Sequence, residues 1–199
     1  NGEIMIAILR HTSAALLLFS ASNALAYNVL KNGDFAGGAN GWNLSGSGGG
    51  FAGTESFFGS PAGGSLRLQS YTFNATAHAD QCVDIHKWFA LDFSLRQFND
   101  GESGSGTHPF KLDVYDAADC GGNVLSTITL PNAGDAVGGN PATGWVEVSV
   151  LGTPLPAGAV SAKVSLDTIA GASGVSYYLL DDVQVVPPDE IFPDGFEAN

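Results

Sequence analysis

The sequence predicts an all-β protein, a two-sheet antiparallel jelly-roll β-sandwich, from three observations. Short runs of Val, Phe, Leu and Tyr recur between turns rich in glycine, and the 199 residues include 27 Gly and nine Pro but only 14% charged residues. The most regular runs alternate apolar and polar side chains, as strands with one buried face do. No amphipathic helix separates these roughly ten or eleven short runs, and such spacing is typical of sandwiches and jelly rolls.

The N-terminus is typical of an export signal. Arg10 and His11 precede an apolar run over residues 14–19, and Ala24-Leu-Ala26 matches a signal-peptidase cleavage site. The run is shorter than a membrane span, although an uncleaved anchor is the alternative. We therefore expect a protein secreted by a bacterial export signal to the periplasm or the exterior.

The length fits a single domain. We expect a signal peptide at residues 1–26 (residues 1–4 precede Met5), a jelly-roll domain at residues 27–187, and an acidic C-terminal tail at residues 188–199.

The charge balance excludes some partners. Seven basic residues stand against 20 acidic ones, a formal net charge of −13. Nucleic acid and anionic membrane surfaces would be repelled by such a field. We expect no nucleic-acid partner, no membrane span and a monomer that binds neutral polymers or divalent cations.

Two cysteines, Cys82 and Cys120, lie in the part that would be exported. An oxidising compartment favours a disulfide between them, and closing that loop would stabilise the fold by about 4 kcal/mol. Two free thiols are the alternative.

The strands follow in order from the pattern. Residues 28–35 form a short strand that runs into an Asn-Gly turn, residues 42–44 a second, and the Gly/Ser-rich residues 45–50 a surface loop. Residues 54–58 form a further short strand, and residues 61–64 a turn. The regular strands then span residues 65–70, 75–85, 88–98, 110–116, 124–130, 145–151, 160–167 and 176–186.

The last of these strands carries an unusual carboxylate. Alternation places Asp181 on the same face as four apolar residues, Tyr177, Leu179, Val183 and Val185. A buried carboxylate needs a cation, a metal or several hydrogen-bond donors. A β-bulge that rotates Asp181 into solvent is the alternative.

Several short motifs resemble a known family. Asn32-Gly-Asp-Phe35 followed by Gly41-Trp42, and Leu180-Asp-Asp-Val183 near the end, resemble the two ends of galactose-binding-like β-jelly-roll modules. Carbohydrate-binding modules of bacterial xylanases and glucanases are the best-known members. Gln81-Cys-Val83 and Asp119-Cys-Gly-Gly122 fit the middle, so the resemblance spans residues 28–186.

The resemblance implies a structural calcium where the first and last strands meet. Asp181 corresponds to a ligand of that ion, and Asp34 or Asn32 would supply another oxygen to a cation that takes six to eight. Relatives often have Glu where this chain has Ala36, so one ligand of the family pattern is missing.

A sugar site requires aromatic faces beside polar side chains. Trp88 and Tyr115 fall on the polar faces of their predicted strands, and Tyr71 and Phe73 are further aromatic candidates in a turn. Isolated surface aromatics are also common on any sandwich. The polar residues predicted to surround Trp88 and Tyr115 are Asp92, Arg96, Lys111 and Asp113, with Arg67 from a neighbouring strand.

The function predicted is that of a secreted, non-catalytic protein similar to carbohydrate-binding modules, with a polysaccharide or other glycan as its partner. The sequence has neither a His-Glu-x-x-His motif nor a Gly-x-Ser-x-Gly elbow, so we expect no enzyme. The alternative is a structural or adhesive surface protein with the same fold and no sugar site. Retardation by a polysaccharide gel separates the two.

Overall fold

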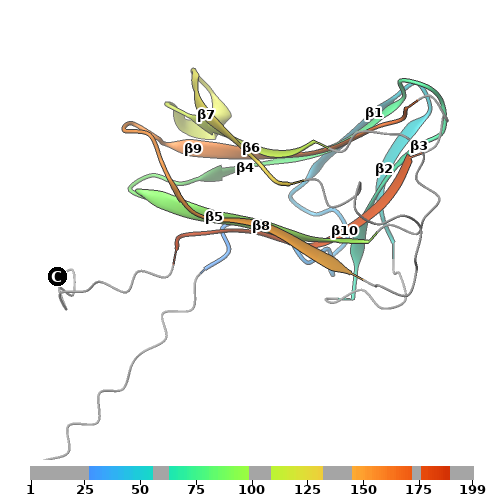
Figure 1. The fold of residues 1–199 in the computed structure, drawn as a ribbon, viewed down its shortest axis with the longest axis horizontal. Coiled ribbons are helices and arrows are strands. Elements are labelled where there is room, and N and C mark those ends of the chain that lie inside the picture. The colour runs from blue at the N-terminus through green and yellow to red at the C-terminus, as the bar shows by residue number, and fades with distance from the viewer. Residues whose placement is uncertain (1–26, 56–62, 99–108, 132–144, 172–175, 189–199) are drawn as a thin grey trace, which may run out of the picture.

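The computed structural model describes residues 27–55, 63–98, 109–131, 145–171 and 176–188. They form two five-stranded antiparallel sheets packed face to face, which confirms the predicted β-sandwich (Figure 1). Sheet A has the strand order β1-β4-β9-β6-β7 and sheet B the order β2-β3-β10-β5-β8. The strands are β1 (Asn43–Ser47), β2 (Gly50–Glu55), β3 (Ser65–Ser70), β4 (Thr76–Asp84), β5 (Ala90–Phe98), β6 (Phe110–Tyr115), β7 (Val124–Thr129), β8 (Val146–Pro154), β9 (Ser161–Ile169) and β10 (Ser176–Val186).

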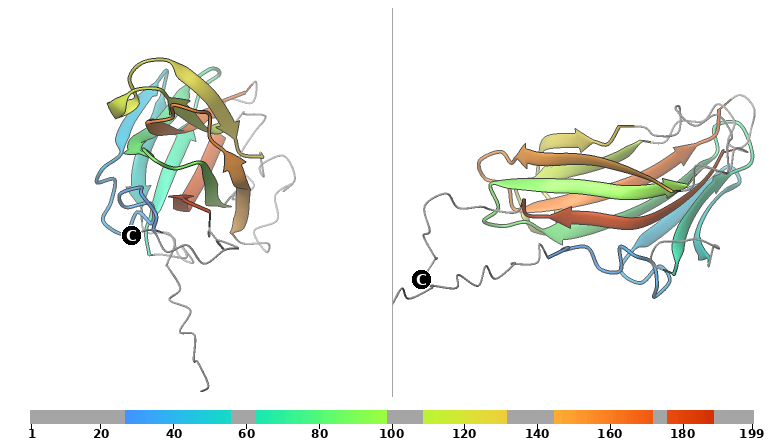
Figure 2. Two further views of the ribbon diagram at one scale, coloured as in Figure 1. Left: turned by 90° about the vertical axis from the view of Figure 1, so that its left-hand side faces the viewer. Right: turned by 60° about the horizontal axis from the view of Figure 1, so that its bottom comes forward.

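Figure 2 shows the same two layers from two other directions. A short 3-10 turn, η1 (Ala118–Cys120), follows β6. Across the described ranges, no helix is long and apolar enough to cross a membrane. The predicted signal peptide and residues 189–199 of the predicted tail lie outside the described residues.

The hydrophobic core lies between the two sheets and takes one face of each strand. In β5, Leu91, Phe93 and Leu95 are fully buried, whereas the polar residues between them are partly exposed. Leu112 and Val114 of β6 meet them from sheet A in the same core cluster. The alternation read from these two strands is therefore confirmed, and the opposite faces are left for polar groups.

The Gly/Ser-rich segment predicted as a surface loop contains the end of β1 and the first residue of β2, joined by a turn at residues 48–49. β1 pairs with β4 in sheet A and β2 pairs with β3 in sheet B, so the turn between them passes from one sheet to the other. A Cβ on Gly50 would lie 1.7 Å from the carbonyl oxygen of Thr76. Glycine is required by this close approach, which strand propensity alone does not reveal.

The predicted first strand, residues 28–35, is a series of turns attached to β10. Asn28 accepts hydrogen bonds from the backbone N–H groups of Leu30 and Val185 (both 3.1 Å), and its Nδ2 donates to the carbonyl oxygen of Val183 (2.9 Å). Val183 N donates in turn to the carbonyl oxygen of Gly33 (2.9 Å). The first and last segments of the domain therefore meet, as the family resemblance implied.

β10 contains a bulge that changes which residues face the core. Its pairing with β5 shifts between Asp181 and Gln184, and Asp182 has a φ of 49°. Leu180 lies in the core before the bulge, whereas Val183 and Val185 do so after it. The prediction that Tyr177, Leu179 and Asp181 share a face with Val183 and Val185 is wrong, because the extra residue of the bulge reverses the alternation.

Asp181 is nevertheless fully buried, as predicted. It pairs with Arg96 of β5, so both side chains lie on the side of sheet B that faces away from the core. Its Oδ1 accepts the backbone N–H of Asp182 at 2.7 Å. The bulge that would have turned this carboxylate into solvent is present, but the carboxylate stays inside the protein.

Cys82 and Cys120 form the predicted disulfide, with their Cα atoms 6.0 Å apart. It links β4 to η1 and so attaches the β6–β7 connection to the middle of sheet A. Asn123 closes the same connection, because its side chain (3.0 Å) and its backbone N–H (2.7 Å) both donate to Asp116. These hydrogen bonds lower the pKa of the Asp116 carboxyl below its ordinary value of 3.8.

Removal of the disulfide should destabilise the domain. The double variant Cys82→Ser/Cys120→Ser should lose about 4 kcal/mol of unfolding free energy, because the unfolded chain regains the freedom of the 38-residue separation. We expect the melting temperature to fall by roughly 8–16 °C in calorimetry. Dithiothreitol should lower the melting temperature of the wild type to the same value and leave that of the variant unchanged. A wild type that melts at one temperature with and without the reductant would contradict the prediction.

The β6–β7 connection should loosen in acid. A carboxyl with a lowered pKa in the folded state contributes stability at pH values above its unfolded pKa of about 3.9, and this contribution is lost as the pH falls through the folded value. The protection factor of the Asn123 amide, measured against the intrinsic exchange rate at each pH, should therefore fall below about pH 4. In the variant Asp116→Asn this side chain does not titrate. The protection of the Asn123 amide should then change with pH only as much as that of the rest of the domain.

Candidate functional site

The outer face of sheet A carries a continuous polar surface. Strand pairing sets its rows, because cross-strand partners point to the same side. Asp80 of β4 lies between Asn43 of β1 and Ser165 of β9, and the next row joins His78 to Asp167. In Figure 1 the ribbon of this sheet rises toward β7 at one end and toward β1 at the other, so its outer side is concave. We call this surface, formed by Asn43, His78, Asp80, Lys111, Asp113, Tyr115, Thr127, Lys163, Ser165 and Asp167, the polar face.

His78 connects the end of the polar face at which β4 begins. Its Nδ1 lies 2.6 Å from Asp167 Oδ1 and its Nε2 lies 2.8 Å from Asp80 Oδ1. Asn43 Nδ2 donates to the other oxygen of Asp80 at 3.1 Å. The three side chains of the ion pairs are 21–29% exposed. The arrangement fixes two carboxylates in place while each remains accessible to a ligand.

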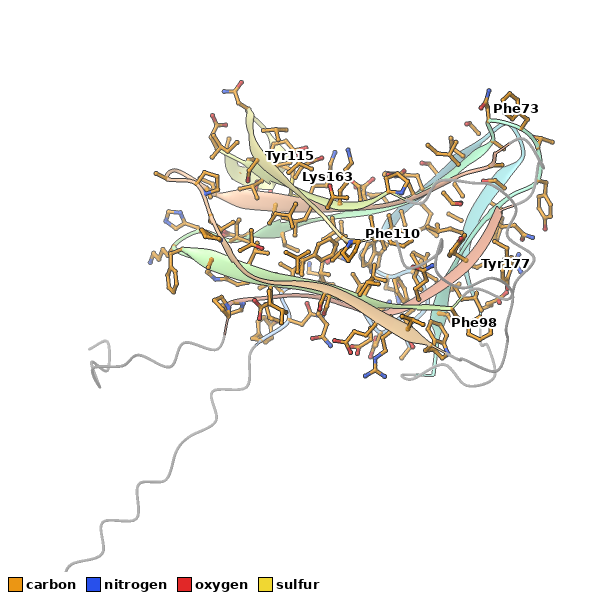
Figure 3. All side chains as sticks on the ribbon, viewed as in Figure 1. Phe73, Phe98, Phe110, Tyr115, Lys163 and Tyr177 are labelled. Carbon is orange, nitrogen blue, oxygen red and sulfur yellow. A yellow bond between two sulfur atoms is a disulfide. The ribbon has the colours of Figure 1, made fainter. Side chains whose placement is uncertain are left out.

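The opposite end of the polar face holds three of the predicted sugar-site residues. Lys111 Nζ lies 3.5 Å from Asp113, whose other oxygen accepts a hydrogen bond from Thr127 (2.6 Å). Tyr115 is only 8% exposed, and the ammonium of Lys163 lies 5.9 Å from the centre of its ring (Figure 3). Lys163 and the burial of Tyr115 leave little of that ring for stacking on a sugar.

Exposed aromatic rings lie instead near the start of β4. Phe73 is 65% exposed and Tyr71 is 55% exposed, both in the connection that enters sheet A (Figure 3). Asn74, beside Phe73, donates its backbone N–H to Ala170 (3.1 Å), which fixes this connection to the end of β9. His78 follows two residues after the start of β4, so exposed aromatics and the carboxylate pair lie toward the same end of the sheet.

The other predicted sugar-site residues lie on sheet B. Arg67 of β3 pairs with Glu55 (2.8 Å), which also accepts the hydroxyl of Tyr177 (2.8 Å). Arg96 of β5 lies 3.6 Å from Asp182 and 3.9 Å from Glu147. These groups are on the face of the sandwich opposite to the polar face.

Trp88 and Asp92 complete the predicted set. Trp88 lies in the β4–β5 turn, partly buried against the core. Asp92 Oδ1 accepts the backbone N–H of Gly152 at 2.5 Å. The seven predicted residues do not form one surface, because β6 belongs to sheet A whereas β3 and β5 belong to sheet B. The chain order of strands cannot show this, since some consecutive strands share a sheet (β2 and β3, β6 and β7) whereas β3, β4, β5 and β6 alternate between the two.

The residues proposed for calcium are placed as follows. Asn32 uses both ends of its side chain within its own loop: its oxygen accepts Gly37 N (3.0 Å) and its nitrogen donates to the carbonyl oxygen of Gly38. Asp34 is exposed and accepts Ala36 N (3.3 Å). Asp181, the third, is buried in the adjoining strand. In the part of the chain that the structure describes, no group of three or more His, Cys, Asp or Glu could hold a metal, so calcium would depend on carbonyl and amide oxygens.

Sequence reasoning missed the His78 cluster. The alternation of β4 places His78 and Asp80 on one face, which was readable from residues 75–85. Asp167 lies 89 positions from His78 along the chain, and only the β4–β9 pairing brings the two together.

Known proteins are similar to this chain in structure rather than in sequence. No protein-family model matches it, and no curated protein is significantly similar in sequence. The enzymatically active domain of tailspike protein 4 from bacteriophage CBA120 is similar with a TM-score of 0.60 at 17% identity, over 80% of this chain and 21% of the tailspike chain. This chain thus spans about a fifth of the tailspike's length.

Two carbohydrate-binding modules match over nearly their whole length. TmCBM61, in complex with β-1,4-galactotriose, has a TM-score of 0.53 at 16% identity, over 81% of this chain and 99% of the module. A family 16 carbohydrate-binding module has a TM-score of 0.50 at 15% identity, over 80% of this chain and 99% of the module. Identities this low establish the fold alone. The chain therefore has the jelly-roll β-sandwich fold of carbohydrate-binding modules, as its opening and closing motifs predicted.

Proposed function

We propose that this chain is an exported, non-catalytic carbohydrate-binding domain that holds a neutral glycan on the polar face of sheet A. The observation that carries the proposal is the cluster in which His78 holds Asp80 and Asp167. Sugar hydroxyl groups are hydrogen-bond donors as well as acceptors, and two fixed carboxylates offer them strong acceptors. Because the protein's own hydrogen bonds already fix these side chains, little conformational freedom is lost when a ligand binds.

The exposed rings of Tyr71 and Phe73 support the same proposal. Carbohydrate rings present C–H groups that pack on flat aromatic surfaces, so a site of this kind combines an aromatic surface with a few polar groups that fix orientation. Phe73 at the start of sheet A and the carboxylates within it would contact successive parts of one glycan chain.

Asp80 and Asp167 on the polar face favour a ligand that carries no negative charge where it meets them. The chain has a net charge of −13, and a second anion placed against Asp80 and Asp167 would be repelled. The structurally similar TmCBM61 was solved with a neutral galactotriose, which is consistent with this class of ligand.

The export and the lack of catalysis rest on separate grounds. The Cys82–Cys120 disulfide is typical of proteins in an oxidising compartment, and it agrees with the signal sequence read from residues 1–26. The sequence shows no hydrolase motif of the kinds considered above. The proposed domain therefore binds glycans and leaves their chemistry to other proteins.

Glycan binding is tested by affinity electrophoresis in gels that contain neutral polysaccharides, including a β-1,4-galactan. We expect the wild type to be retarded by at least one of them. Asp167→Ala should weaken that binding about tenfold, because a hydrogen bond to a charged group contributes roughly 1.5–3 kcal/mol. Phe73→Ala should weaken it by a few-fold to about tenfold through the lost ring contact.

Glu147→Gln is the matched control. Glu147 is also an exposed carboxylate, with a side chain 60% accessible, but it lies on sheet B. Its substitution should leave the retardation by each polysaccharide, measured relative to a gel without polysaccharide, unchanged. Equal losses in Asp167→Ala and Glu147→Gln, or no retardation of the wild type by any polysaccharide, would refute the proposal.

We also propose a structural calcium at the junction of residues 28–38 with β10. Its support is the burial of Asp181 next to the segment that joins the two ends of the domain. A bound ion would stabilise the folded state by about 2.7 kcal/mol at a hundredfold excess over its dissociation constant.

Melting in EDTA tests the calcium. We expect a lower melting temperature in EDTA, restored by Ca²⁺ but not by Mg²⁺, since the smaller ion requires stricter geometry. Asp181→Asn should melt at one temperature in EDTA and in Ca²⁺. A wild-type melting temperature that EDTA leaves unchanged would count against the ion.

A further inference from the structure

A depression lies at the end of the sandwich where two connections between the sheets meet, on the left in Figure 1. The β4–β5 turn supplies His86, Lys87, Trp88 and Phe89, and the β8–β9 connection supplies residues 155–160. Its volume of about 360 Å³ is within the range of small-ligand sites. It lies away from the His78 cluster.

The walls of this depression are aromatic and held in place. Trp88 packs against the core, and its backbone N–H donates to Ile85 (3.0 Å). Phe89 is 60% exposed, and its carbonyl oxygen accepts the N–H of Leu155 (2.8 Å) from the facing connection. Phe89 precedes the first residue of β5, Ala90, and its ring lies at the surface although Leu91, two residues on, is buried in the core.

The charge of the depression is opposite to that of the protein. The chain has 20 acidic and seven basic residues, yet Lys87 and His86 line the depression and no carboxylate is among its described lining residues. Two carboxylates close in sequence to these lining residues accept backbone hydrogen bonds: Asp84 accepts the N–H of His86 (2.7 Å), and Asp92 accepts that of Gly152.

Lys87 also has an unusual backbone. Its φ of 76° lies in the left-handed region, which costs a side-chain-bearing residue about 1 kcal/mol or more and is more readily adopted by Gly or Asn. The chain therefore has a lysine at the edge of an aromatic depression despite the cost of this backbone conformation.

We propose that this end depression binds a carboxylate-bearing sugar, a uronic acid unit, with its ring on Phe89 and Trp88 and its carboxylate on Lys87. That the ligand is a sugar rests on the proposed function; the site itself does not depend on the polar face. The overall negative charge does not prevent this binding, because salt screens charges beyond about 8 Å at physiological ionic strength. The nearby ammonium group of Lys87 therefore contributes more to the electrostatic interaction with the sugar carboxylate than the distant acidic residues do.

The experiment is a calorimetric titration of the whole chain with a galacturonic acid trimer and with the neutral galactose trimer. Lys87→Asn is the informative variant, because Asn tolerates the left-handed backbone while the charge is removed. We expect it to lose at least tenfold in affinity for the acidic trimer, and Phe89→Ala, at an exposed position, to lose affinity as well. Wild-type affinity for this ligand should fall as salt rises. Equal affinity in Lys87→Asn and the wild type, or no binding of the acidic trimer, would overturn the proposal.

The proposed polar-face site and the proposed end depression are tested independently by two variants. Asp167→Ala should lose retardation by neutral polysaccharide and retain the acidic trimer, whereas Lys87→Asn should show the reverse. A short poly-Glu peptide serves as the competitor of a different class. If it binds as tightly as the acidic trimer and is equally sensitive to Lys87→Asn, the sugar assignment is overturned in favour of an acidic peptide.

Discussion

The arrangement of the domain depends on hydrogen bonding along both edges of β10. This strand lies at the centre of sheet B, with β5 on one side throughout its second half, whereas β3 pairs only with its first half. The other edge of the second half would be left without partners. Residues 28–33 supply them through Asn28, Val29 and Gly33. The start of the domain therefore completes the sheet that its end forms, although the segment is too irregular to be a strand.

The bulge in β10 belongs to the same region. Asp182 adopts a left-handed backbone, and the alternation of the strand reverses there, so that Leu180 and Val183 both reach the core. Asp181 is left on the outer side of the sheet without solvent. Burial of a carboxylate is costly. This one lies in the strand to which the opening segment of the domain is joined, and it accepts the backbone N–H of Asp182.

Assignment of strands to sheets separates the functional surfaces. Sheet A, whose polar face carries the His78 cluster, reaches the opening segment through Gln81 of β4, which bonds the backbone of Lys31. The hydrogen bonds between that segment and the last strand belong to sheet B. The end depression with Lys87 is built by connections that pass between the sheets. A glycan held along the polar face and a charged sugar held at the end would thus use two surfaces with opposite local charge on one rigid sandwich.

The sequence by itself determined the β-sandwich, the pairing of the two cysteines and the inner faces of β5 and β6, since these follow from composition, cysteine count and local alternation. It placed Asp181 on the core face, whereas the bulge in β10 leaves this buried carboxylate on the outer side of sheet B. It could not determine that Arg67 and Tyr115 lie on opposite faces of the molecule, or that Asp167 reaches His78 from 89 residues away. The sequence suggested a loop at residues 45–50, where β1 ends and β2 begins, because glycine lowers strand propensity. The requirement for glycine at position 50 arises from its close approach to the backbone of Thr76, which the sequence does not show. Alternation assigns a residue to one of two faces of its own strand, but only the pairing of distant strands decides which sheet that strand joins and which side chains meet across it.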